Sequence, residues 1–400
     1  MRALLNLLLL AAMLRLPLLL TAGVPLFDEA FYVQSAKAML SGAPDPVQDQ
    51  PFFGRYIIAG SIAVLGDNRL GWRLPSLFAG CACVGLLYLI CLRLGLGNKL
   101  SAFAAVLLAL DPLHITFSRI AMLDIFALTF SLAGLYVLLS AGKNPGQWSL
   151  AGLLFGLAIA SKWPAVFAVT GAICFVLLND KKGLSFLKPV SGMLMIIAAV
   201  YLLTFLPLII STGPQAFLDL HLGKMSSHLS MQGGAQISRP WEWLLGWQPI
   251  WLGWNDEPAF PFAAIALANP VTWWSGLVAL LSVFIRLLQL MLARFRHMKT
   301  GIRLTTAETF CLVWFAATWV PWMLLPRGHT FLYYMLPVLP AYFIALASFV
   351  RRNPRKWAVP AIIAAAIAGL ALFYPVVIGL SMPSGYFESL RWWIGWAPQV

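Results

Sequence analysis

The most informative shortage in this 400-residue chain is charge. Only 10% of its residues are charged, whereas 61% are hydrophobic and the mean hydropathy is +0.84. Soluble domains contain roughly 25% charged and about 45–50% apolar residues, and one globule cannot bury this much apolar surface. The composition therefore excludes a water-soluble enzyme and indicates a polytopic membrane protein.

Cysteine is also scarce. All five cysteines lie inside apolar runs, with no C-x-x-C pair and no cluster of cysteine with histidine. The sequence therefore predicts buried thiols, with neither a disulfide nor a metal site. Short alternating runs typical of strands are missing too, so the long continuous apolar runs favour an all-α protein.

The apolar residues fall into eleven segments, which predict eleven transmembrane helices in a single domain spanning 1–400. The first lacks an A-x-A cleavage site, so we interpret it as a retained span. The fifth and sixth are shorter than the roughly 20 residues of a full span and are separated only by Lys162, so they form either a tight hairpin or one kinked element. The segments are 4–23, 73–92, 101–117, 122–140, 149–161, 163–178, 189–211, 262–285, 307–325, 330–349 and 357–379.

Acidic residues are half as frequent as basic ones, 14 against 27, and this imbalance predicts the orientation. With the N-terminus in the cytoplasm and alternating segments, the cytoplasmic connections hold sixteen basic residues and only Asp180 and Glu308 as acids. Basic residues gather on the cytoplasmic side of membrane proteins. The net charge of +13 thus reflects orientation in the plasma membrane and contact with anionic lipids, not nucleic-acid binding.

Both long polar connections, residues 25–72 and 212–261, then fall on the outer side. The first predicts an amphipathic helix on the membrane surface, with Asp28 and Glu29 in its first turn. Acids at this position suit the helix dipole, which is a purely structural explanation for the pair. Oligomeric state is left open by the sequence.

Isolated cations accompany this acidic pair at the outer ends of spans. Arg119, Lys162 and Arg327 are the clearest, and each alone is explained equally well by snorkelling to the interface. Together with an acidic pair they have a chemical meaning. Cations can hold a lipid-linked phosphate and stabilise it as it leaves, and a carboxylate can accept the proton of an attacking hydroxyl. These parts are compatible with a glycosyltransferase that uses a polyprenyl-phosphate sugar.

Eight stretches, in order along nearly the whole chain, resemble the dolichyl-phosphate-mannose protein mannosyltransferase family, which has the GT-C membrane glycosyltransferase fold. They include an Asp-Glu motif, a Ser-Arg…Leu-Asp segment and a Ser-x-Lys-Trp segment. The stretches are "RLPLLLTAGVPLFDEAFY", "DQPFFGRYI", "GWRLPSLFAG", "HITFSRIAMLDIF", "GLAIASKWPAVF", "SRPWEWLLGWQPIWL", "FLYYMLPVLPAY" and "FYPVVIGLSMP".

The resemblance implies an inverting transfer of a sugar, mannose by family, from a polyprenyl or dolichyl monophosphate to Ser/Thr hydroxyls of an exported protein, without a metal or other cofactor. By motif position, Asp28 is the catalytic carboxylate, and Glu29 orients the site by pairing with a cation. Arg119 and Lys162 contact the donor phosphate, and Asp124 anchors local structure through Arg119. We further assign Arg55 and Arg327 to the donor phosphate, and Gln50, Asp124, Arg239, Trp241, Glu242 and His329 to the substrate groove.

The chain also departs from the family. Gln50 and Phe52 replace a His and a Pro of the family stretch, and Arg55 replaces its Lys. Eukaryotic members carry a luminal MIR domain where this chain has a loop of about fifty residues, 212–261, so this is a short form whose acceptor recognition rests on loops. The tryptophans of that loop form either an interfacial belt or a platform for sugar or lipid.

Two alternatives remain open. A GT-C transferase with a lipid or glycan acceptor, similar to aminoarabinose or arabinofuranose transferases, would share the donor chemistry and the acidic first loop. A membrane transporter would also be polytopic with intramembrane charge. Transporters commonly show paired repeats, and the sequence shows none.

Overall fold

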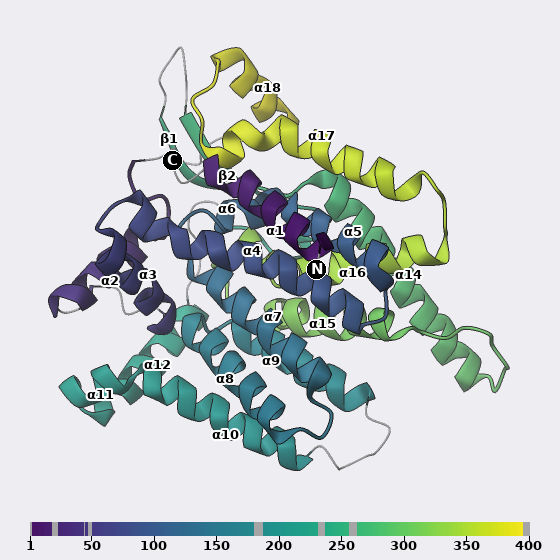
Figure 1. Cartoon of the computed structure of the whole chain (residues 1–400), viewed down its shortest axis with the longest axis horizontal. Coiled ribbons are helices and arrows are strands. Elements are labelled where there is room, and N and C mark those ends of the chain that lie inside the picture. The colour runs from purple at the N-terminus through teal and green to yellow at the C-terminus, as the bar shows by residue number, and fades with distance from the viewer. Residues whose placement is uncertain are drawn as a thin grey trace.

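The computed structural model of the chain describes residues 2–17, 23–43, 45–46, 50–179, 187–230, 237–255 and 262–394. Its regular structure is nearly all helical (Figure 1). The elements are α1 (Arg2–Arg15), α2 (Glu29–Ser41), α3 (Phe53–Leu65), α4 (Arg69–Arg93), α5 (Gly97–Ala109), α6 (Pro112–Phe117), α7 (Leu123–Ala141), α8 (Pro145–Ser161), α9 (Ala165–Asn179), α10 (Leu187–Thr204), α11 (Leu206–Thr212), α12 (Pro214–Ser230), α13 (Pro240–Trp243), β1 (Ile250–Asn255), β2 (Phe262–Ala266), α14 (Pro270–Phe295), α15 (Thr306–Leu324), the short 3₁₀ helix η3 (Leu332–Met335), α16 (Leu339–Arg352), α17 (Ala358–Ile378) and α18 (Ser384–Ile394).

Six helices of the described chain are long and apolar enough to cross a membrane, namely α4, α7, α10, α14, α15 and α17. Each of the eleven apolar segments contains a helix, but the count of eleven spans is not confirmed. Three segments divide into two helices each, because a proline interrupts or restarts the helix at Pro112, Pro207 and Pro340. The remaining expectation, a membrane protein built of helices, is confirmed.

The fifth and sixth apolar segments are two separate helices. α8 ends at Ser161 and α9 begins at Ala165, with Lys162–Pro164 as the turn between them. α8 packs mainly against α7 and α10, whereas α9 packs mainly against α15. Gly134 of α7 permits the close approach, because a Cβ there would lie 2.6 Å from the ring of Phe155 on α8. This packing sets the end of α8 beside the beginning of α7.

The first outer loop forms the helix that its periodicity predicts. Asp28 is the residue before α2, Glu29 lies in its first turn, and Gly42 ends it with a left-handed φ of 69°. A second helix, α3, follows in the same loop and packs against α2 and α4. In Figure 1, α2 and α3 lie together at the left edge of the molecule, away from the α14–α15 connection at the right edge.

The tryptophan-rich loop contains an antiparallel hairpin that an all-α prediction omits. Strand β1 pairs with β2 in the register Ile250↔Ala266 and Trp254↔Ala263. The apolar segment expected at 262–285 therefore begins as a strand, and α14 starts only at Pro270, where Asn269 caps it. Aromatic and β-branched residues such as Trp251 and Ile250 favour strands, which explains the hairpin.

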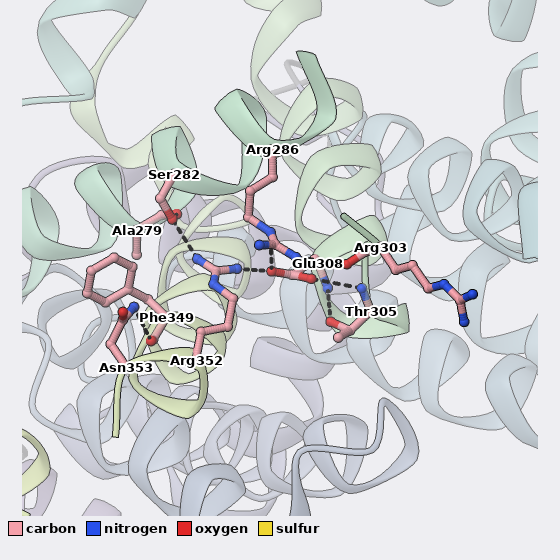
Figure 2. A network of polar contacts seen from close by, with 9 residues as sticks. All are labelled: Ala279, Ser282, Arg286, Arg303, Thr305, Glu308, Phe349, Arg352 and Asn353. Carbon is pink, nitrogen blue, oxygen red and sulfur yellow. Dashed lines mark hydrogen bonds and ion pairs between the residues drawn. The ribbon is translucent and has the colours of Figure 1, made fainter. Parts of the chain in front are cut away.

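One buried carboxylate, Glu308, joins the ends of α14, α15 and α16 that lie away from the first outer loop (Figure 2). Glu308, in the first turn of α15, forms ion pairs with Arg286 of α14 and Arg352 of α16. Thr305 and Glu308 form a capping box, and Arg352 also donates a hydrogen bond to Ser282 at 2.7 Å. The charge pattern assigns all these helix ends to the cytoplasm; that assignment stays a prediction, but the structure does gather them in one place.

Candidate functional site

Glu29 is fully buried and both of its carboxylate oxygens are engaged. Arg73 of α4 donates from Nε to Oε1 at 2.8 Å and from a terminal nitrogen to Oε2 at 2.7 Å. The backbone amides of Leu26 and Ala121 also donate to it, each at 2.9 Å. Glu29 therefore ties the first loop to α4 and to the connection before α7. It pairs with a cation, as the resemblance implies, and this saturation makes it an anchoring group instead of a proton acceptor.

Asp28 lies directly beside this anchor and is only partly buried. The preceding residue, Phe27, has a φ of 53°, an uncommon conformation for a residue other than glycine. Its amide donates to the carbonyl of Leu252 on β1 at 3.1 Å, and its ring packs edge-on against Tyr333 with centroids 6.4 Å apart. Burial, with a smaller contribution from Asp28, raises the pKa of Tyr32 well above its usual range. Asp28 is thus held in a fixed turn between β1, η3 and α2.

Arg119 is fully buried, and two of its three guanidinium nitrogens have no hydrogen-bond partner among the described residues. Its remaining contact is a long hydrogen bond, 3.4 Å, to the carbonyl of Ile378. Burial lowers its pKa, and the neighbouring Arg73 adds to this effect. The hydrogen bonds and the ion pair of Glu29 go to Arg73, and Arg119 feels Glu29 only as a nearby negative charge. An anion beside Arg119 would relieve both the excess charge and the unmet hydrogen bonds.

Lys162 pairs with Asp124 at the junction of α7, α8 and α9. Its ammonium group donates to Asp124 Oδ2 at 2.7 Å and lies 4.6 Å from the ring centroid of Tyr333. The sequence-based expectation that Asp124 pairs with Arg119 is wrong. The antiparallel packing of α7 on α8 brings Asp124, in the first turn of α7, close to Lys162, which directly follows α8. Lys162 is therefore the partner of Asp124.

This pair sits at the edge of a pocket between α7, α9, α15 and η3. The pocket has an empty volume of about 430 Å³, including its open mouth. Tyr333 links it to Asp28, because the tyrosine lies against both Phe27 and Lys162. The lining is mainly apolar and consists of Asp124, Ala127, Leu128, Ser131, Lys162, Pro164, Ala165, Phe167, Ala168, Thr318, Trp322, Tyr333, Tyr334 and Pro337.

Arg55 is not held by this pocket. Its guanidinium forms an ion pair with Asp45 and hydrogen bonds to Ser35 and to the carbonyl of Gln50, all within the first loop. Burial lowers the pKa of Arg55, and Asp45 opposes that change. The contacts of Arg55 with Asp45 and with the Gln50 carbonyl therefore hold the first loop together. The partner of Arg55 in this structure is an acid of the same loop.

Arg327 and His329 lie on the segment before η3. The guanidinium of Arg327 is 5.8 Å from the ring of Tyr334, which lines the pocket, and the His329 ring packs edge-on against Phe331. The same segment pairs with the tryptophan-rich loop, since Ser238 N donates to the Thr330 carbonyl at 2.9 Å. Arg327 therefore lies beside the pocket, whereas His329 contacts Phe331, which is not part of the lining.

The remaining predicted groove residues lie on and around α13. Arg239 is exposed and stacks on Trp241, and Glu242 caps the helix by accepting from the Arg239 amide. Trp243 is fully buried and packs against Trp322 and Tyr334. The tryptophan run is thus divided: Trp243 and Trp251 are buried, whereas Trp241, Trp247 and Trp254 are exposed.

Four residues of the site had no assigned role in the sequence: Arg73, Tyr32, Tyr333 and Trp322. Tyr32 lies in "RLPLLLTAGVPLFDEAFY", Arg73 in "GWRLPSLFAG" and Tyr333 in "FLYYMLPVLPAY", so these three lie inside recognised motifs. No local pattern distinguishes them from interfacial residues. Within the described residues no group of three or more His, Cys, Asp or Glu side chains could hold a metal ion.

Comparison with known proteins gives a consistent result. Residues 49–210 match the family model described as dolichyl-phosphate-mannose-protein mannosyltransferase, and residues 214–396 match the C-terminal four-helix membrane region of protein-O-mannosyltransferase. A curated relative, the polyprenol-phosphate-mannose–protein mannosyltransferase of Mycobacterium tuberculosis, is 22% identical over 96% of this chain and 88% of its own length.

Two further similarities bear on the alternatives. The Saccharomyces cerevisiae Pmt1–Pmt2 complex bound to the sugar donor superposes with a TM-score of 0.85 at 14% identity, covering 99% of this chain and 92% of that one. An undecaprenyl phosphate-α-4-amino-4-deoxy-L-arabinose arabinosyl transferase of Pseudomonas aeruginosa is 33% identical, but over only 35% of this chain and 28% of its own length. The two family models together span most of the chain, which belongs to the protein O-mannosyltransferase family of GT-C membrane glycosyltransferases.

Proposed function

We propose that this protein transfers mannose from a polyprenyl-phosphate donor to serine or threonine hydroxyls of exported proteins. The observation that carries the proposal is that Phe27, the residue before Asp28, packs against Tyr333, which also contacts Lys162 and lines the pocket. The full-length similarity to polyprenol-phosphate-mannose–protein mannosyltransferases supports it. The plasma membrane, with this end outside, is the proposed location.

The pocket fits the donor in chemical character. Its lining is mostly apolar, as an isoprenoid chain requires, and its polar groups gather around Lys162 and Asp124. Arg119 offers two buried, unpartnered nitrogens near Glu29, the residue after Asp28. We assign the donor phosphate to the space between these cations, where negative charge would be neutralised as the sugar leaves. Arg327 at the rim would add a weaker attraction.

The proposed chemistry is a single displacement. Asp28 accepts the proton of the acceptor hydroxyl, the hydroxyl oxygen forms a bond to C1 of the sugar, and the bond from C1 to the phosphate oxygen breaks with inversion. The polyprenyl phosphate leaves with the electron pair, and Lys162 and Arg119 stabilise its charge. Glu29 holds the turn that presents Asp28. No step of this proposed reaction needs a metal ion.

The acceptor would approach between the two outer loops. Phe27 is hydrogen bonded to Leu252, so the β1 hairpin lies against the turn that carries Asp28. Arg239, Trp241 and Glu242 lie in or beside the short helix α13 of the second outer connection, and Gln50 lies in the first. Loops this short offer little surface for reading a sequence. We therefore expect acceptors that are extended, flexible Ser/Thr-containing segments with loose sequence preference.

A transferase with a lipid or glycan acceptor remains the second candidate, because the partial match to the arabinosyl transferase shares the lipid-phosphate donor. Purified protein incubated with polyprenyl-phosphate mannose should transfer mannose to a Ser/Thr peptide and not to lipid A or oligosaccharide. Transfer to the lipid or glycan alone would overturn the protein-acceptor proposal. Absence of sugar release with any acceptor would instead favour the transporter alternative.

A further inference from the structure

A chain of three side chains leads from the outer loop to the turn that carries Lys162. His221 of α12 lies 2.6 Å from the hydroxyl of Tyr201 on α10 through its Nε2 atom. The indole Nε1 of Trp163 donates to the same hydroxyl at 2.7 Å. These contacts join helices that are far apart in sequence, and neither the proposed chemistry nor the pocket uses them.

The geometry fixes the direction of each hydrogen bond. The Nδ1 atom of His221 lies 2.7 Å from the backbone carbonyl of Phe217, which can only accept, so Nδ1 carries a hydrogen. In the neutral ring Nε2 is then the acceptor, and the Tyr201 hydroxyl donates to it. The hydroxyl oxygen is left to accept from Trp163. The side-chain polar atoms of His221, Tyr201 and Trp163 therefore all have a suitable partner only when His221 provides an acceptor at Nε2.

Aromatic packing holds the same residues in place. The ring of Phe205 on the α10–α11 connection lies 5.0 Å from both His221 and Phe52 of the first loop, centroid to centroid, and 4.9 Å from Tyr201. The ring of Phe217 lies tilted against His221, with centroids 4.1 Å apart. The two outer loops and α10 thus share one aromatic cluster against the α8–α9 turn.

The Lys162–Pro164 turn connects the aromatic cluster to the pocket. Lys162 has extended backbone angles, φ −157° and ψ 129°, so its side chain and that of Trp163 point to opposite sides. Trp163 faces Tyr201, and Lys162 faces Asp124 and Tyr333. Fixing the indole on one side of the turn consequently fixes the ammonium group on the other.

We propose that His221, acting through Tyr201 and Trp163, is a positioning residue that holds the Lys162–Pro164 turn in the geometry required for the donor phosphate. The inference rests on the proposed function, in which Lys162 meets that phosphate. It makes α12, a helix of the loop at 212–261, part of donor binding as well as of the outer surface.

Two measurements test the proposal on the full chain in nanodiscs, with polyprenyl phosphate as the binding probe. His221→Ala should raise the dissociation constant by about three- to tenfold, the usual worth of one hydrogen bond. It should also speed hydrogen exchange at the amides of Ala165, Val166 and Phe167, which bond back to the turn. Tyr201→Phe should do the same, and the double variant should be no worse than either single one.

The conservative variant separates positioning from general damage. His221→Gln keeps an acceptor near the position of Nε2, so it should restore affinity and exchange protection. Gln215→Ala, which breaks an exposed hydrogen bond to Asp219 on the same helix, is the matched control and should change neither. A glutamine variant as weak as alanine, or an equal effect in the control, would overturn the inference.

The outcomes also distinguish this inference from the function it rests on. Unchanged affinity in His221→Ala, with a wild type that binds polyprenyl phosphate and transfers sugar, refutes the positioning role alone. A wild type that does not bind polyprenyl phosphate refutes the proposed function and the phosphate role of the turn with it.

Discussion

Glu29 and Glu308 are two buried carboxylates in the same local setting. Each lies in the first turn of a helix and accepts from the backbone amide three residues earlier, Leu26 at 2.9 Å and Thr305 at 2.8 Å. Each also pairs with arginine from another helix, Arg73 in one case and Arg286 and Arg352 in the other. They belong to different ends of the bundle: α15 runs about 21 Å from Glu308 to the pocket residue Trp322, at roughly 1.5 Å per residue.

The difference lies in what surrounds them. Around Glu308, the ion pairs and hydrogen bonds of Figure 2 stay within one cluster that joins α14, α15 and α16. Beside Glu29 there is a second carboxylate, Asp28, and an arginine, Arg119, with two unpartnered nitrogens. At the Glu308 end, Glu308 Oε1, Arg286 Nε and Arg352 Nη1 also lack a hydrogen bond, but each faces an opposite charge in an ion pair. Among the described residues Arg119 has no such ion pair, and a buried charge with unmet hydrogen bonds is costly and points to a ligand. The comparison therefore supports the proposal that the Glu308 end is structural and that the reaction takes place at the Glu29 end.

The sharpest test of this contrast is Asp28→Asn against Glu308→Gln. We expect Asp28→Asn to reduce transfer by about 10²- to 10⁴-fold, the usual loss for a general base, with donor binding retained. Glu308→Gln should leave the turnover of folded protein near normal. Radiolabelled mannose transfer to a peptide measures both. Near-normal turnover of Asp28→Asn would mean that this carboxylate only begins a helix.

Removing Glu29 should affect stability more than removing Glu308. Glu29→Gln leaves the fully buried Arg73 without its carboxylate, a change that typically costs about 3–5 kcal/mol. The arginines paired with Glu308 are 20% and 29% exposed, so water can compensate in part, and Glu308→Gln should cost less. Thermal unfolding in detergent measures both variants. The comparison fails if Glu308→Gln proves the more destabilising.

Arg119 and Lys162 provide an intermediate test. Arg119→Ala and Lys162→Ala should each weaken binding of polyprenyl phosphate, slow transfer, or both, because charge-assisted hydrogen bonds are worth about 1.5–3 kcal/mol each. Arg119→Lys should restore only part of this, since an ammonium lacks the planar fork. Arg286→Ala, at the other end, is the matched control for loss of one arginine. Unchanged affinity and turnover in both alanine variants would show that these cations only stabilise the fold.

The sequence predicted the local features of this comparison well. The apolar runs become helices, α2 begins at the Asp28–Glu29 pair, and Glu29 does pair with a cation. Its partner, Arg73, is 44 residues away, and no local pattern reveals which distant helix packs there. The same limit explains why the sequence predicts the nearby Arg119 as the partner of Asp124, whereas the structure pairs it with Lys162. The β1–β2 hairpin was missed because tryptophans spaced for an interfacial belt also suit a strand.

An exposed ion pair, Lys37–Asp67, provides a reference for the effects of substitutions at Glu29 and Glu308. Lys37 and Asp67 join α2 to the residues before α4, with side chains 51% and 42% exposed. The hydrogen bond from Lys37, more than that from Trp72, lowers the pKa of Asp67. Any stability that this carboxylate contributes is therefore present at neutral pH, and it is lost as the pH falls through the folded-state pKa of Asp67. Solvent screening keeps that contribution small. We expect Lys37→Ala to leave both transfer and the unfolding temperature within experimental error at neutral pH. A fall of the unfolding temperature comparable with that of Glu29→Gln would show that the surface contact fixes the first loop on α4 as strongly as the buried Glu29–Arg73 pair does.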